Sequence, residues 1–305
     1  MIKKIINQLL DDNQINLNFG EKPQRIDIVL GGGAFNGSYL IGALFFLKEM
    51  EKRNYIIVER ISGCSIGSIA GLLYILDDLD KIFILYKHLS QKFKKNRNLS
   101  VIKNIKKILG YKDSNELCNR INHKLYICYN NIKTREKIVK NKYKNFDDLC
   151  KSMICSCFIP YLIDENISYK NKYIDGINPY LFEEIPNKKI LFLELYTVDK
   201  LNCILNIKNE KSNFHRILYG LLEMHNFFIK NKSTQMCSYV NHWSLFEKKY
   251  NMLKKVLEKI CIYLISFFVM LHNNVQDDIK KLFIYEYITK LNRKIVIYIL
   301  DNYCL

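Results

Sequence analysis

Two short glycine-rich turns constrain the fold of this chain more than any other feature of its sequence. Gly31-Gly32-Gly33-Ala34-Phe35-Asn36-Gly37 follows a buried strand predicted at residues 25–30, and Gly63-Cys64-Ser65-Ile66-Gly67 follows a second strand predicted at residues 55–61. A helical spacing of apolar residues begins after each turn. Strand, turn and helix repeated in this order are typical of a parallel α/β sheet, whose functional loops gather at the carboxyl ends of the strands. Both turns are therefore predicted to open at one edge of the sheet.

The remaining pattern extends this α/β arrangement and then becomes mainly helical. We expect a lead-in with one helix in residues 1–24, an α/β domain with a mainly parallel central sheet in residues 25–205, and a helical region packed on it in residues 206–305. The elements predicted are helices at 2–10, 40–50 and 68–79, a basic helical stretch at 80–119, strands at 125–129 and 137–139 joined by a turn at Asn130-Asn131, strands at 168–174 and 189–198, and helices beyond 205 that include an apolar stripe at 279–295.

The chain is strongly basic. Its 47 Lys and Arg exceed its 30 Asp and Glu, which gives 305 residues a formal net charge of +17. This excess fits a lysine-rich solvated surface, and it also fits attraction to an anionic partner such as an acidic membrane surface or a nucleic acid. No zinc-finger spacing or RNA-binding aromatic signature accompanies the charge, so the sequence favours the membrane over nucleic acid.

Cysteine usage and hydropathy suggest an intracellular protein without a membrane span. The ten cysteines form no C-x-x-C pair and no Cys/His cluster with zinc spacing, which favours free thiols and predicts no metal site. The apolar run before Asp11 is too short for a secretory signal. The longest uncharged apolar stretch, residues 260–271, is too short to span a bilayer, for which about 20 residues are needed. It favours a buried core helix, with a basic membrane-surface helix as the alternative.

The first glycine turn does not fit a nucleotide site. A P-loop places Lys directly after its second glycine, whereas Ser38 and Tyr39 follow Gly37 here. A dinucleotide fingerprint requires glycine at position 36, where the chain has Asn36. No nucleotide cofactor is therefore expected, and the turn is left as a row of unshielded backbone N–H groups.

The second turn fits G-x-S-x-G, the nucleophile elbow, which lifts a serine above the sheet. Ser65 is then the candidate nucleophile, with Gly63 and Gly67 relieving the crowding around it and Cys64 a packed neighbour. When a serine attacks a carbonyl, fixed backbone donors stabilise the resulting oxyanion. The candidate donors are the N–H groups of Gly31, Gly32, Gly33 and Ile66.

A serine nucleophile requires a base, and the sequence offers two kinds. Six histidines (His88, His123, His215, His225, His242 and His272) leave a Ser-His-Asp esterase open, although none lies at a predicted strand end. Asp175 does, because it closes the strand predicted at 168–174 and is followed by Gly176. A partly desolvated carboxylate there has a raised pKa and accepts the serine proton directly.

These segments in this order resemble the patatin-like phospholipase family over roughly residues 25–200. The resemblance rests on the turn ending at Gly37, the Ser65 elbow, Asp175-Gly176 and the small-residue run Cys155-Ser156-Cys157. It implies a three-layer α/β/α fold and a metal-independent hydrolase without cofactors. That hydrolase cleaves phospholipid or other lipid esters through a Ser-Asp dyad and an acyl-enzyme, and the basic surface would hold it at an anionic membrane.

Three positions depart from the family pattern. Asn36 stands where Arg or Lys is usual, Ile177 replaces a small residue after Asp175-Gly176, and Phe158 occupies a place where a small residue is common. These departures keep open a weakly active or inactive patatin-fold protein that binds lipids or another partner. The sequence predicts no oligomeric state.

Overall fold

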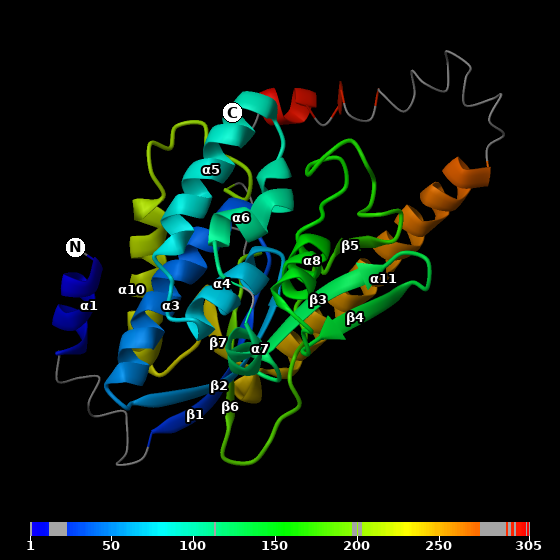
Figure 1. Cartoon of the computed structure of the whole chain (residues 1–305). Helices are drawn as coiled ribbons and strands as arrows, with labels where there is room; N and C mark the ends of the chain where they lie inside the picture. Colours follow the sequence, from blue (N-terminus) through cyan, green and yellow to red (C-terminus); the bar gives the residue numbers. More distant parts are fainter. Residues whose placement is uncertain are drawn as a thin grey trace.

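The protein has a three-layer α/β/α fold built on a mixed seven-stranded sheet (Figure 1). The computed structural model describes residues 2–11, 23–112, 114–196, 200, 203–274, 291, 294–295, 297–302 and 304. The strand order is β4-β3-β2-β1-β6-β7, with β5 paired to β3. The strands are β1 (Gln24–Leu30), β2 (Ile56–Cys64), β3 (Leu125–Asn131), β4 (Glu136–Lys140), β5 (Tyr173–Asp175), β6 (Lys189–Leu193) and β7 (Cys237–Tyr239).

The central strands are parallel, and the antiparallel pairs lie toward the sides of the sheet. β1 pairs in parallel with β2 and β6, and β2 pairs in parallel with β3, whereas β4, β5 and β7 run antiparallel to their neighbours. The register places Leu30 opposite both Gly63 and Leu193. The two glycine turns therefore leave the sheet at the same edge, as predicted.

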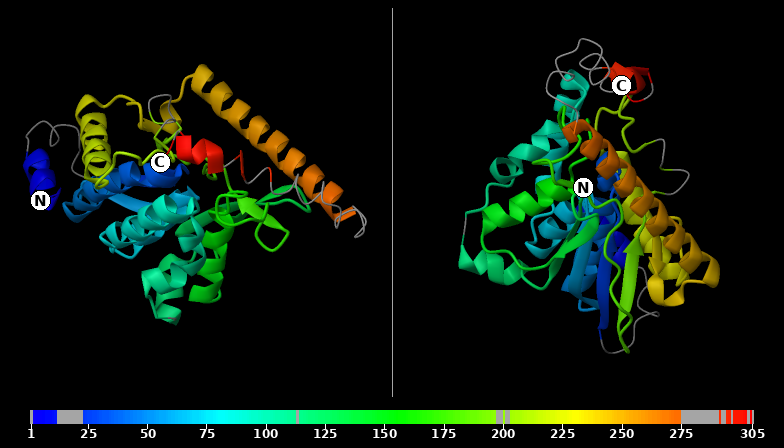
Figure 2. Two further views of the ribbon diagram at one scale, coloured as in Figure 1. Left: turned by 90° about the horizontal axis from the view of Figure 1, so that it is seen from above. Right: turned by 90° about the vertical axis from the view of Figure 1, so that its right-hand side faces the viewer.

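Helices cover both faces of the sheet. Helices α4 and α8 pack on β2 and β3, while α11 crosses the opposite side of the molecule (Figure 2). The helices are α1 (Ile2–Leu10), α3 (Gly37–Lys52), α4 (Ile66–Ile75), α5 (Lys81–Asn96), α6 (Ile105–Leu109), α7 (Asn115–Ile121), α8 (Phe146–Ser156), α10 (Phe214–Lys230) and α11 (Leu245–Asn274), with 3₁₀ segments η1 (Ala34–Asn36), η2 (Ser100–Asn104) and η3 (Val240–His242).

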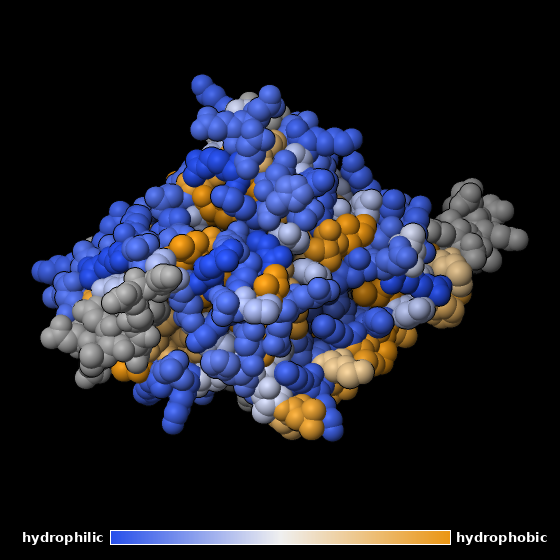
Figure 3. Space-filling view, turned by 90° about the horizontal axis from the view of Figure 1, so that it is seen from below, coloured by the Kyte–Doolittle hydropathy of each residue, from blue (hydrophilic) through white to orange (hydrophobic). Residues whose placement is uncertain are grey.

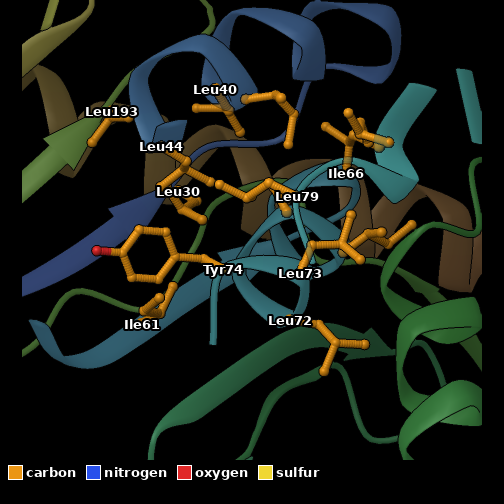
Figure 4. Packing of buried hydrophobic residues seen from close by; sticks show 14 of the residues in the cluster. Leu30, Leu40, Leu44, Ile61, Ile66, Leu72, Leu73, Tyr74, Leu79 and Leu193 are labelled. Carbon is orange, nitrogen blue, oxygen red and sulfur yellow. The ribbon is translucent and has the colours of Figure 1, made fainter. Parts of the chain in front are cut away.

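The main core lies between β1, β2 and the helices α3 and α4 (Figure 4). The strand β1 is buried on both faces. Successive side chains of a strand point to opposite sides, so neighbouring residues of β1 enter different clusters. Ile28 and Leu30 enter the main core, while Val29 packs on the other face with Phe182 and Phe192. A strand buried on both faces reads as a continuous apolar run, which is why β1 is recognisable in the sequence.

Two glycines let α10 lie directly against α3. A Cβ on Gly42 would be 1.8 Å from the carbonyl oxygen of Ile217, and one on Gly220 would be 1.9 Å from that of Tyr39. Since both obstacles are backbone atoms, no side-chain movement can make room for a larger residue. This crossing fixes α10 on α3, the first helix that follows β1.

Most predicted elements are confirmed, and the differences have local causes. The predicted turn at Asn130-Asn131 is wrong, because both residues continue β3 and the chain turns at 132–135. The predicted strand at 168–174 shrinks to the short β5, which runs antiparallel to β3. β2 continues into the elbow as far as Cys64.

Two findings concern the C-terminal region, in which we expected only helices. β7 was not predicted, and it joins the sheet from a region in which we expected helices. The apolar stripe at 279–295 lies largely outside the described residues.

The expected buried core helix at 260–271 is wrong. The stretch forms the second half of α11, and Leu264 and Phe268 are 53% and 60% exposed. Only a narrow side of this half packs inward, including Ile262 and Ser266. None of the helices in the described residues has an uncharged apolar stretch of the length that a membrane span requires.

Candidate active site

Ser65 lies in the sharp turn between β2 and α4, in a backbone conformation that is rare for a residue with a side chain. Its φ is 51° and its ψ is −130°. The turn is held from both sides: the Ser65 N–H donates to Ser156 Oγ (2.9 Å), and the Ser65 carbonyl accepts from Ser68 Oγ (2.6 Å). Ser156 in turn donates to the carbonyl of Cys128 (2.6 Å). These hydrogen bonds hold Ser65 in a strained backbone conformation, and such conformations are typical of functional sites.

Glycines bring the two turns into contact. A Cβ on Gly37 would lie 2.2 Å from Ile66 Cγ1, and a Cβ on Gly67 would lie 2.6 Å from the Leu30 carbonyl oxygen. A Cβ on Gly63 would meet the backbone of Gly67 at 2.5 Å. The start of α4 can therefore sit directly against the end of β1 and the first glycine turn, which no larger residue would permit.

Asp175 reaches the same place from β5. It pairs with Tyr129 on β3, and its N–H donates to the Phe158 carbonyl (3.0 Å). Gly176 presses so closely on β3 that a Cβ would lie 2.3 Å from the Cys128 carbonyl oxygen. Although the strand is short and antiparallel, this contact brings the Asp175 side chain to the cavity that Ser65 lines.

The Asp175 carboxyl is buried and only half satisfied. Its Oδ1 accepts from the Ile177 N–H (2.7 Å), whereas its Oδ2 has no hydrogen-bond partner of normal geometry. Burial raises the pKa of Asp175 to about 6, against smaller opposing effects of the Ile177 N–H and the nearby Ser65 side chain. The carboxylate is therefore mostly ionised at neutral pH and has one oxygen available to accept a proton.

The candidate oxyanion donors do not share one environment. The Gly31 N–H donates to the Leu193 carbonyl (3.0 Å), so it belongs to the sheet and is engaged. Of the three glycines, Gly32 is the nearest to the nucleophile, since a Cβ on it would lie 3.2 Å from Ser65 Cβ. Gly33 lines the cavity with Ser65, and Ile66 is in the first turn of α4, where N–H groups have no partner within the helix. These facts narrow the predicted set to Gly32, Gly33 and Ile66.

A cavity of about 320 Å³ opens on Ser65 and Asp175. Its walls are mainly apolar and come from segments far apart in the sequence. They are lined by Gly33, Ala34, Ile159, Pro160, Ile174, Ile177, Tyr196, Ile204, Cys261 and Ile265. A smaller apolar pocket that Ser65 also lines is bounded by Phe35, Leu89 and Ile163.

The other candidate groups are placed differently. Cys64 is fully buried, donates to the Ile177 carbonyl (3.3 Å), and has a pKa raised well above its ordinary value by burial. It is a packed neighbour, as predicted. Of the five histidines whose side chains are described, none lines either pocket at Ser65, and His272 lies outside this set. In the described part of the chain, no cluster of three His, Cys, Asp or Glu side chains could hold a metal ion.

Glu258 on α11 is a site residue that the sequence did not reveal. Its buried carboxylate accepts from Asn130 Nδ2 (3.0 Å), Asn178 Nδ2 (3.0 Å) and Lys137 Nζ (2.9 Å). The same Asn130 amide donates to the Asp175 carbonyl (2.9 Å). The charge of Glu258 also contributes to the raised pKa of Asp175. No motif signals this residue, because it lies 83 positions beyond Asp175 on a helix without turn chemistry.

Arg216 is a second residue near the site that the sequence did not reveal, and it adjoins the first glycine turn. Asn36 is uncharged, but its Oδ1 accepts from the buried guanidinium of Arg216 on α10 (2.7 Å). Arg216 also donates to the carboxylate of Glu210 (2.7 Å) and to the carbonyls of Cys203 and Asn206 (both 2.8 Å). A positive charge therefore does lie beside position 36, although another element supplies it.

Comparison with known proteins matches the sequence of this region to a family. The family model described as patatin-like phospholipase matches residues 28–179. The match begins within β1 and ends shortly after Asp175, so it contains both glycine turns and the two candidate catalytic residues. A comparison with curated proteins finds no match to the chain.

Proposed function

Because the chain belongs to the patatin-like phospholipase family through residues 28–179, we propose that it is a lipid acyl hydrolase that uses Ser65 as nucleophile and Asp175 as base. The observation that carries this proposal is the Asp175 carboxylate. It is buried beside Ser65, has a pKa raised to about 6, and leaves Oδ2 without a partner. A carboxylate in that state accepts a proton at neutral pH without help from histidine.

The proposed reaction begins when the Ser65 oxygen attacks an ester carbonyl and its proton passes to Asp175 Oδ2. The carbonyl oxygen becomes an oxyanion at the backbone N–H groups of Gly32, Gly33 and Ile66, which lie around Ser65. Collapse of this intermediate breaks the ester C–O bond, and the departing alcohol takes the proton from Asp175. Water then attacks the acyl-enzyme and Asp175 accepts its proton. The bond between the acyl group and Ser65 breaks, the Ser65 oxygen takes the proton back from Asp175, and the fatty acid leaves.

The walls of the cavity support a lipid substrate. Apolar side chains from three separate elements surround Ser65, and burial of a hydrocarbon chain against them is favourable by about 0.8 kcal/mol for each methylene. Asp175 is the acidic side chain that lines this cavity. We propose acyl esters of phospholipids as the substrate.

Labelling by a fluorophosphonate probe tests the nucleophile, and hydrolysis of a short-chain ester tests the base. Ser65→Ala should abolish labelling, and Asp175→Asn should lower kcat by at least about 100-fold. Ser152→Ala is the matched control, because this buried serine bonds only to the Asp148 carbonyl within α8. Retained hydrolysis in Asp175→Asn would refute the dyad.

The same assay separates the two alternatives. A Ser-His-Asp esterase predicts that one of the six His→Gln variants loses activity while Asp175→Asn keeps it. A lipid-binding protein without activity predicts no labelling of Ser65 and no product from phospholipid vesicles. This second alternative is motivated by Ile177, a β-branched residue that follows Asp175-Gly176 with a strained backbone φ of 54°. Identification of the products from mixed-lipid vesicles then assigns the substrate class.

A further inference from the structure

The side of helix α11 that faces the protein carries paired polar residues together with Ile262, whereas most of the large apolar residues of the helix face solvent. The inward side carries Glu258, bound to Asn130, Asn178 and Lys137, and Lys254, which pairs with Glu194. Ser266 accepts a hydrogen bond from Arg135 Nε (3.2 Å). An amphipathic surface helix normally buries its apolar stripe, so this arrangement is reversed.

The outward side is the largest concentration of exposed apolar side chains in the described part of the chain. Fourteen of the 25 large hydrophobic residues that are exposed there belong to α11. They form a band along its whole length and appear as apolar side chains along the lower right edge of Figure 3. The members are Leu245, Phe246, Tyr250, Met252, Leu253, Val256, Leu257, Ile260, Tyr263, Leu264, Phe267, Phe268, Met270 and Leu271.

Lysines accompany this apolar band. Lys248, Lys255 and Lys259 are exposed, and their spacing of seven and four positions places them on one side of the helix, beside the band. An apolar face bordered by basic residues is the pattern of a helix that lies in a membrane interface. An anionic lipid surface attracts each such lysine with about 1 kcal/mol.

We propose that α11 is the surface by which the protein docks on an anionic lipid bilayer, with the helix lying in the plane of the interface. The reason for docking rests on the proposed function. Cys261 and Ile265 of the same helix line the cavity of Ser65 and Asp175, so the helix that enters the interface also borders the cavity that would receive a lipid.

A bilayer fits this face better than a second copy of the chain does. The apolar residues cover a broad arc and not the narrow seam by which two helices pair. Two copies would also bring together chains that each carry a net charge of +17, whereas that charge favours an anionic surface.

Flotation with vesicles tests docking without any catalysis. The Ser65→Ala protein is mixed with vesicles of phosphatidylcholine and phosphatidylserine, so that the lipids stay intact. Leu264→Glu/Phe267→Glu in that background should lower the vesicle partition coefficient by at least about tenfold. Ile57→Glu/Ile84→Glu is the matched control, because these residues have comparable exposure, 41% and 51%, and lie outside α11. Circular dichroism melting confirms that each variant is folded.

Substitution of the lysines and measurement of the oligomeric state provide the second part of the test. Lys255→Gln/Lys259→Gln removes two lysines, or about 2 kcal/mol, and should therefore reduce binding about 30-fold on anionic vesicles and have little effect on phosphatidylcholine alone. The proposal is overturned if the Ser65→Ala protein does not float, or if the α11 variant floats as well as the control does. It is also overturned if α11 substitutions convert a dimer to a monomer without changing flotation, because the face then belongs to a second copy.

Docking and hydrolysis can fail separately. Hydrolysis of a soluble ester by the unaltered chain tests the proposed function alone. Flotation without such hydrolysis would leave docking in place and refute the enzyme, whereas hydrolysis without flotation would refute docking.

Discussion

Replacing Asp175 by Asn should raise the free energy of unfolding at neutral pH while it removes the activity. The carboxylate is buried, its Oδ2 has no partner, and burial is the main cause that moves its pKa from 3.8 to about 6. The folded protein therefore holds an ionised group in an environment that favours its neutral form. Asparagine has nearly the same shape and keeps an oxygen that can accept from the Ile177 N–H.

The size and sign of the effect follow from proton linkage. Below about pH 4 the carboxyl is protonated in both states, and above about pH 6 it is ionised in both. Between these values the folded state binds the proton and the unfolded state does not, so the free energy of unfolding falls by about 1.4 kcal/mol for each pH unit gained. Across the interval the loss is about 3 kcal/mol, and the Asn variant does not share it. The difference between variant and wild type should grow by that amount from about pH 4 to about pH 7.

Two assays must then report one pKa. Urea unfolding followed by circular dichroism gives the difference in stability at each pH. In wild type, kcat/KM for a soluble ester should fall to about a tenth of its plateau near pH 5, since only about a tenth of Asp175 is ionised there. A stability difference that does not change with pH, or an acid limb near pH 4, would refute the reasoning.

Asp148→Asn is a control of opposite sign. Burial alone would raise the pKa of Asp148, but its hydrogen bonds with Lys140 and the Lys144 N–H outweigh burial and lower it. The ionised Asp148 therefore stabilises the fold above the ordinary pKa, and that contribution is lost as the pH falls. This variant should be less stable than wild type at neutral pH, and the difference should shrink toward acid.

Three further outcomes are expected. Glu258→Gln should move the acid limb of kcat/KM to lower pH, because the Glu258 charge helps to raise the pKa of Asp175; an unchanged midpoint would show that the two groups are not coupled. Gly42→Ala should cost more than about 3 kcal/mol of unfolding free energy, whereas Gly110→Ala, with φ 67° and nothing within 4 Å, should cost about 1 kcal/mol; similar costs in urea unfolding would contradict the close helix crossing. Maleimide should modify the exposed Cys261 and lower ester hydrolysis, since this residue lines the cavity, and a Cys261→Ser protein that is equally inhibited would contradict this.

Much of the fold, and the choice of candidate residues, could be predicted from local sequence. β1 could be predicted because a strand buried on both faces is continuously apolar, and the two turns could be predicted because glycines mark close backbone approach. Parallel topology then placed both turns at one edge, and the register of Leu30 with Gly63 confirms it.

The errors arose where distant contacts override local pattern. Asn130 is a good turn former, but its amide is needed between Asp175 and Glu258, so it stays in β3. The stretch at 260–271 is apolar enough for a core, but only a narrow side of it, which includes Ile262 and Ser266, has partners in the protein, so most of its large apolar residues stay exposed. A window of sequence shows which residues share one side of a helix, but the partners that cover that side come from elsewhere in the chain.

The sequence by itself therefore determined the α/β pattern, the glycine turns and the candidates Ser65 and Asp175, because each depends on neighbouring residues along the chain. Only the tertiary structure decided which N–H groups around Ser65 are engaged, how far burial raises the pKa of Asp175, and that Glu258 and Arg216 adjoin the site. Desolvation and hydrogen bonding depend on every group within a few ångströms, and in this protein those groups come from elements far apart in the chain.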